Sequence, residues 1–188
     1  MAVNVRRVRF VACLAMCVLP AVPVARAGSI ANGPRLPKYV AAVTPRIVEY
    51  AAVVKRLDGI LSETPMVNVD PKVDKLRAVA SRFDQLAARW GPIQAPKGMK
   101  LRHRGMGRVF ELHAQGWRTY ADGLFTRHPE ELHDAIVKLG AMLRSAAYLQ
   151  KRWAAALQGA LIRAGVTVPR WLRGMASEPS AGRVFVQS

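Results

Sequence analysis

The chain has 188 residues and a formal net charge of +17, from 29 Lys and Arg against 12 Asp and Glu. Its two cysteines both lie within the first 17 residues, so the rest of the chain cannot form a disulfide, a thiolate nucleophile or a cysteine metal site. These properties exclude a disulfide-stapled scaffold and favour a basic protein with anionic partners.

Residues 1–27 have the three-part order of a secretory signal peptide. Three arginines within residues 6–9 precede an apolar run from Phe10 to Val24, and Ala-Arg-Ala at 25–27 provides a small-x-small cleavage site. The run has only 15 residues and contains two prolines, whereas a spanning helix needs about 20 apolar residues. We therefore expect cleavage after Ala27 and a periplasmic or secreted product, exported by either the general or the twin-arginine route.

The mature part would keep 161 residues with a net charge of +13 and no cysteine. Residues 28–36 have few large apolar side chains, and the stretch from Gly28 to Pro37 contains two prolines, which predicts an extended lead-in. A helix is expected from Pro37, because proline suits the first helical turn. Pro45 either kinks this helix or marks a later start. Apolar residues recur at steps of three and four along it, at Val40, Val43, Ile47, Ala51, Val54, Leu57 and Leu61.

Turn-forming residues at 62–71 separate this segment from a second predicted helix. Asp70 is expected to cap that helix, with Pro71 in its first turn. Gly91-Pro92 and Ala95-Pro96 end it. Its apolar stripe comprises Val73, Leu76, Ala80, Phe83, Ala87 and Trp90.

A third helix is predicted over residues 97–125 and a fourth from Pro129 to about Gly165. Pro129 and two following glutamates suit a helix start, where the dipole favours acids. A short helical turn is expected at 169–172. The inner face of the predicted third helix comprises Met106, Phe110, His113, Trp117, Tyr120 and Leu124. The inner face of the predicted fourth helix comprises Leu132, Ile136, Leu139, Leu143, Ala146, Gln150, Trp153, Leu157 and Leu161.

Four long amphipathic segments with short connections predict an all-α fold, an antiparallel up-down-up-down four-helix bundle over residues 37–176. Short connections favour this arrangement because they force successive helices to reverse direction. Residues 177–188 are expected to form a disordered tail. A helical solenoid is disfavoured, since no repeat of fixed period is present.

Basic residues predict a surface that binds anions or an acidic partner. A cationic strip is expected along the third helix, and a tryptophan flanked by arginines follows the fourth. The alternative is an ordinary solvated helix face. The predicted residues are Lys97, Lys100, Arg104, Arg108, Arg170, Trp171 and Arg173.

Histidine and methionine residues on the third helix support a second interpretation, in which the bundle binds haem b or a metal ion. His103, Met106 and His113 could face inwards, as haem ligands do in some bundles. Glu130 and His133 have the Glu-x-x-His spacing of di-iron bundles, but the chain has one copy where two are needed. A structural histidine in the core edge is the competing interpretation of His113.

Motifs for covalent catalysis and phosphate-cradling glycine loops are missing from the sequence. We therefore expect a non-enzymatic envelope protein without a cofactor, which binds or scaffolds an anionic surface or an acidic protein. Export argues against a nucleic-acid partner, and peripheral membrane contact is compatible with the charge. The alternative function is haem or metal binding through the inward-facing histidine and methionine side chains.

Overall fold

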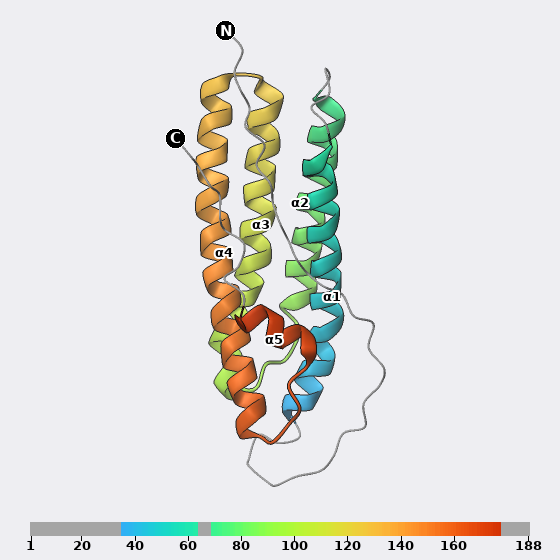
Figure 1. Ribbon diagram of the computed structural model, residues 1–188, viewed down its shortest axis with the longest axis vertical. Helices are drawn as coiled ribbons and strands as arrows, with labels where there is room; N and C mark the ends of the chain where they lie inside the picture. The colour runs from blue at the N-terminus through green and yellow to red at the C-terminus, as the bar shows by residue number, and fades with distance from the viewer. Residues whose placement is uncertain (1–34, 64–68, 178–188) are drawn as a thin grey trace.

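The computed structural model describes residues 35–63 and 69–177, and every regular element in these ranges is helical. Long helices lie side by side, and the short helix α5 crosses in front of their lower part (Figure 1). The elements are α1 (Arg35–Ser62), α2 (Asp70–Trp90), the 3₁₀ turn η1 (Lys97–Met99), α3 (Lys100–Thr126), α4 (Pro129–Arg163) and α5 (Arg170–Ser177). The all-helical prediction is therefore confirmed for the described residues.

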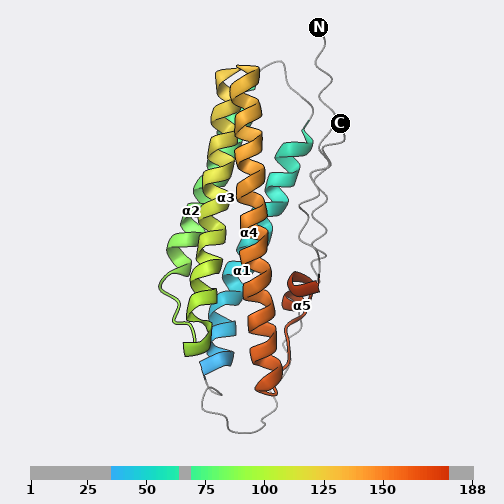
Figure 2. The same ribbon diagram turned by 90° about the vertical axis from the view of Figure 1, so that its left-hand side faces the viewer.

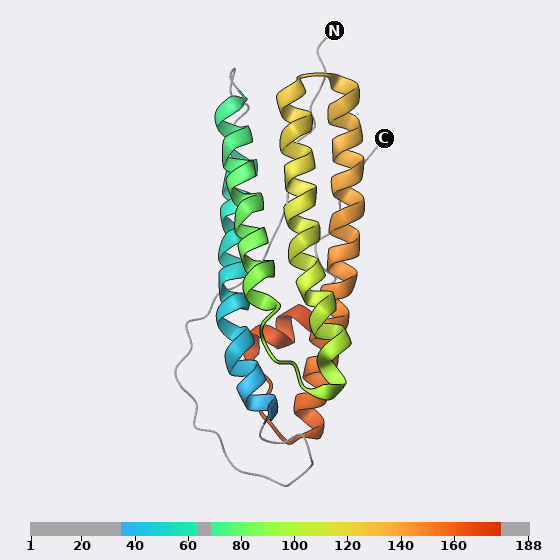
Figure 3. The same ribbon diagram turned by 180° about the vertical axis from the view of Figure 1, so that it is seen from behind.

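The five α-helices pack in chain order, with α1 on α2, α2 on α3, α3 on α4 and α5 on α4. Figure 3 shows the link from α2 through η1 to α3 at the lower end of the molecule, where α1 begins and α4 ends. Figure 2 shows α5 beside the lower part of α4. The predicted signal peptide 1–27, most of the predicted lead-in and residues 178–188 lie outside the described residues.

The helix α1 begins at Arg35, two residues before the predicted start, so the end of the expected lead-in is helical. Leu36 is buried, and its burial favours extending the helix by one more half-turn. Pro37 then occupies the first turn, where its missing N–H removes no intrahelical hydrogen bond. Pro45 lies inside the helix, so it does not mark a later start.

The predicted cap of α2 is wrong by one residue. Val69 occupies the capping position without a side-chain hydrogen bond, and Asp70 is the first helical residue. In that position its carboxylate still interacts favourably with the helix dipole, and it pairs with Arg127 at 3.2 Å.

Two glycines let α3 and α4 approach closely. A Cβ atom at Gly123 would lie 2.5 Å from the Cβ of Ala135, and one at Gly116 would lie 2.9 Å from a methyl carbon of Leu139. Ala135 therefore occupies the buried position on α4. The apolar stripe had placed Ile136 inside, but this side chain is 46% exposed. The close contact selects the small residue over its larger neighbour.

Tryptophans form the centre of the core, as their positions on the apolar stripes predicted. Trp90, Trp117 and Trp153 are at most 2% exposed. The rings of Trp90 and Trp153 meet edge to face with centroids 5.5 Å apart, a favourable geometry for aromatic pairs. The core thus joins α2, α3 and α4 through large rigid side chains.

The segment after α4 turns back on the bundle. Gly165 has a φ of +66°, a left-handed conformation that glycine adopts without strain. The helix α5 is longer than the predicted turn, and it extends through Ser177, where a disordered tail was expected. In the described ranges, no helix combines the length and the apolar character needed to span a bilayer.

Candidate anion-binding groove

A hollow of about 390 Å³ lies between the first part of α3 and the middle of α4. Within the part of the chain that the structure describes, seven residues line it, of which four are arginines and none is acidic. The lining consists of Leu101, Arg102, Arg104, Gly105, Arg108, Leu149 and Arg152. We call this hollow the arginine groove.

Helical spacing explains why these residues meet. Leu101, Arg104 and Arg108 recur at steps of three and four, so they lie on one face of α3. Gly105 leaves space below them, and a Cβ atom there would touch Leu149 of α4 at 3.7 Å. The groove therefore has an apolar floor, with cationic side chains extending from both helices.

The arginines of the groove differ in their existing partners. Arg108 pairs with Glu111 at 2.7 Å, but both side chains are more than half exposed, so this ion pair contributes little energy. Arg152 donates a hydrogen bond to the hydroxyl of Tyr148 at 2.7 Å. Arg102 and Arg104 make no ion pair with any described acid. Positive charge thus remains available to an external anion.

The structure brings together only part of the predicted basic surface. Arg104 and Arg108 line the groove, whereas Lys97 and Lys100 are exposed just before it, in η1 and at the start of α3. Arg170 and Arg173 are exposed on α5 and do not line the groove. Trp171 is partly buried, and its ring stacks on Trp153 with centroids 6.1 Å apart.

Two arginines of the groove were not selected from the sequence. Arg102 is next to the predicted strip, and Arg152 comes from α4. The strip was defined by spacing within one helix, which cannot show which residues of a second helix lie opposite. Arg152 and Leu149 are three residues apart on α4, and this spacing was the available signal.

A first buried polar cluster surrounds His103. The Tyr39 hydroxyl lies 3.0 Å from His103 Nδ1 and accepts a hydrogen bond from Trp153 Nε1, also at 3.0 Å. The His103 ring stacks on Trp90 with centroids 4.8 Å apart. Burial lowers the pKa of His103, so the ring is neutral. If the Tyr39 hydroxyl donates to Nδ1, the ring hydrogen is on Nε2, which is buried without a partner.

A second cluster surrounds His113 in the same way. The Tyr50 hydroxyl lies 3.1 Å from His113 Nε2 and donates to Gln150 Oε1 at 3.1 Å. Phe83 stacks on the His113 ring with centroids 4.8 Å apart. The residue is only partly buried as a whole, but its Nδ1 is enclosed and unpartnered. Burial lowers the pKa of His113 to about 4 and raises that of Tyr50.

The predicted haem or metal residues are separated in the structure. His103 and Met106 are buried and His113 is inside, whereas Glu130 and His133 are exposed near the start of α4. Within residues 35–63 and 69–177, no three His, Cys, Asp or Glu side chains cluster as a metal site. The histidine rings pack against aromatic rings, and no histidine is among the described residues that line the arginine groove. Haem or metal binding stays a prediction.

Comparison with protein-family models, curated proteins and solved structures found no match for this chain.

Proposed function

We propose that this protein is an exported, non-enzymatic envelope protein that binds an anionic membrane surface through the arginine groove. The observation that carries the proposal is a set of four arginines around an apolar floor, with no acid among the described lining residues. Guanidinium groups stay charged at any physiological pH and match the geometry of phosphate oxygens. A phosphate-bearing lipid head group fits this chemistry.

Binding is favoured over catalysis by the same lining residues. Arginine, leucine and glycine side chains offer no group that could act as a general base or nucleophile near neutral pH. Export is inferred from residues 1–27, whose basic, apolar and small-residue regions follow the order of a signal peptide. An envelope location would expose the groove to anionic lipids.

We also propose that the helices form an antiparallel up-down-up-down four-helix bundle. The two histidine clusters support this topology, because each cluster combines one residue from each of the four long helices at the same height along the molecule. From the His103 cluster to the His113 cluster, residue numbers rise in α1 and α3, from Tyr39 to Tyr50 and from 103 to 113. They fall in α2, from Trp90 to Phe83, and in α4, from 153 to 150. Helices in which the residue number rises therefore run antiparallel to helices in which it falls.

Sedimentation with lipid vesicles tests the proposed function. The mature protein should bind phosphatidylglycerol vesicles and not phosphatidylcholine vesicles, and the binding should weaken between 50 mM and 500 mM salt because salt screens exposed charges. The variant R104Q/R152Q removes one cation from each side of the groove. We expect it to lose at least tenfold in affinity.

The matched control is R56Q/R82Q, which removes two exposed arginines from α1 and α2 and changes the net charge equally. It should retain affinity within about threefold of the wild type. Equal losses in the two double variants would mean that net charge alone drives binding, and the groove would then have no specific role. Indifference to lipid charge would refute the proposed function itself.

A further inference from the structure

We infer that a second groove accepts the acyl chain of the same anionic lipid, so that the protein binds a single amphiphile and not only a membrane surface. The inference rests on the proposed function and names its ligand class. The groove has a volume of about 330 Å³, at the lower end of the range for small-molecule sites. We call it the apolar groove.

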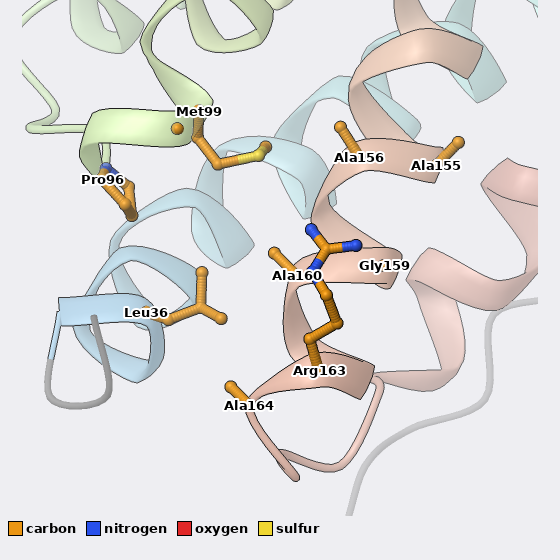
Figure 4. Close-up of a pocket in the computed structure, with 10 residues that line it drawn as sticks. Leu36, Pro96, Met99, Ala155, Ala156, Gly159, Ala160, Arg163 and Ala164 are labelled. Carbon is orange, nitrogen blue, oxygen red and sulfur yellow. The ribbon is translucent and has the colours of Figure 1, made fainter. Parts of the chain in front are cut away.

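The apolar groove lies at the end of the molecule where α1 begins and α4 ends. Figure 4 shows Leu36 and Met99 extending from α1 and η1 toward α4, with the Arg163 side chain along the α4 turn that contains Gly159. The other lining residues are Pro96, Gly98, Ala155, Ala156, Ala160 and Ala164. Among the described residues that line the groove, Arg163 is the only charged one and none is acidic.

Small side chains on α4 create the space. Alanine or glycine occupies four lining positions of that helix and a fifth at Ala164, just after its end. Leu36, Pro96 and Met99 close the opposite side and are themselves buried. A Cβ atom at Gly159 would meet only the end of the Arg163 side chain, at 3.4 Å. Removing methylene groups from water into such a groove favours binding about fourfold for each group.

The two grooves are neighbours along α4. Arg152 of the arginine groove and Ala156 of the apolar groove are four residues apart, so they lie on one face of the helix. On the other side, Gly98 of the apolar groove precedes Leu101 of the arginine groove by three residues. From Arg152 to Gly159 the helix rises about 10 Å.

The two grooves together place a cationic site beside an apolar one, which matches the charged head and apolar chain of an anionic amphiphile. The phosphate would be held by the arginines, and one acyl chain would run along α4 past Ala156 and Gly159. Charge complementarity selects an anionic head group, because Arg163 and the four groove arginines are all cationic. The apolar lining selects a chain over a free phosphate ion.

Calorimetric titration with monomeric ligands tests this inference. The mature protein should bind oleoyl lysophosphatidic acid at one molecule per chain, and at least a hundredfold more tightly than glycerol 3-phosphate, which has the same phosphate without the chain. Oleoyl lysophosphatidylcholine, which has the chain without the net charge, should bind at least tenfold more weakly than the acid.

The decisive variant is Gly159→Leu, which fills the apolar groove and should weaken lysophosphatidic acid binding at least tenfold. Gly140→Leu is the matched control, because it lies on the same helix and a Cβ atom there also meets an arginine, Arg144, at 3.4 Å. Both changes raise helix propensity, so both variants should fold. Gly140→Leu should bind as the wild type does.

Equal affinity of the wild type for lysophosphatidic acid and glycerol 3-phosphate would overturn the inference, as would wild-type affinity in Gly159→Leu. If the vesicle binding still depended on Arg104 and Arg152 in that case, the proposed function would stand without the chain site. Loss of vesicle binding together with loss of lysophosphatidic acid binding in R104Q/R152Q supports both.

Discussion

Acid should destabilise this protein through His113, and the substitution His113→Phe isolates that effect. The ring is neutral in the folded state because burial lowers its pKa to about 4, from an ordinary value of 6.5. Phenylalanine keeps an aromatic ring against Phe83 while it removes both the titrating group and the unpartnered Nδ1. Tyr50 retains its hydrogen bond to Gln150.

The difference in proton binding between the folded and unfolded states determines how the free energy of unfolding changes with pH. Above pH 6.5 the histidine is neutral in both states and contributes no pH dependence. Between pH 6.5 and about 4 the unfolded chain binds a proton that the folded protein does not, so the free energy of unfolding falls with pH. Each pH unit removes about 1.4 kcal/mol, so the loss by pH 4 is about 3 kcal/mol. That is a large fraction of the 5–15 kcal/mol typical of a domain.

Urea denaturation at pH 7 and pH 4, followed by tryptophan fluorescence, measures this difference. The wild type should lose about 3 kcal/mol more than His113→Phe over this interval. His133→Gln provides the control, because it removes an exposed histidine and should lose as much as the wild type. Equal losses in the wild type and His113→Phe would refute the assignment of acid sensitivity to His113.

Other predictions concern the core. Tyr39→Phe should lower the free energy of unfolding by about 2 kcal/mol, because Trp153 Nε1 and His103 Nδ1 both lose their hydrogen-bond partner. The control Tyr148→Phe, at a residue that is 58% exposed, should change it by less than about 0.5 kcal/mol. Urea denaturation compares the two, and equal effects would contradict the buried network. Gly123→Ala should destabilise by about 1–3 kcal/mol, since its Cβ would lie 2.5 Å from Ala135. Gly59→Ala should instead stabilise by about 0.5–1 kcal/mol, because an added Cβ atom there has no described atom within 4 Å. Thermal unfolding compares the two glycine variants, and a gain of stability in both would contradict the close contact between α3 and α4.

Helical periodicity predicted most of the fold because burial in this protein follows steps of three and four. The predicted α1 stripe, including Val43, Ile47 and Leu57, faces the core as expected. Periodicity failed at Ile136, where the partner helix decides burial. Only the position of Gly123 opposite α4 makes Ala135 the buried residue.

The candidate site was less predictable, because it depends on pairing between helices. Spacing within α3 selected Arg104 and Arg108, but it could not indicate that Arg152 of α4 lies beside them. The tyrosine partners of the two histidines were missed for the same reason. Tyr39 and Tyr50 are 64 and 63 residues from His103 and His113, respectively. Contacts at that separation follow from the packing of the bundle and not from local pattern.

The most direct test of the arginine groove is an NMR titration that observes each arginine side-chain Nε–H signal while oleoyl lysophosphatidic acid is added. We expect the signals of Arg102, Arg104, Arg108 and Arg152 to shift together and to saturate at one ligand per chain. The signals of Arg56 and Arg82, on α1 and α2, should stay in place. Shifts spread evenly over all arginines, or confined to those outside the groove, would contradict the account.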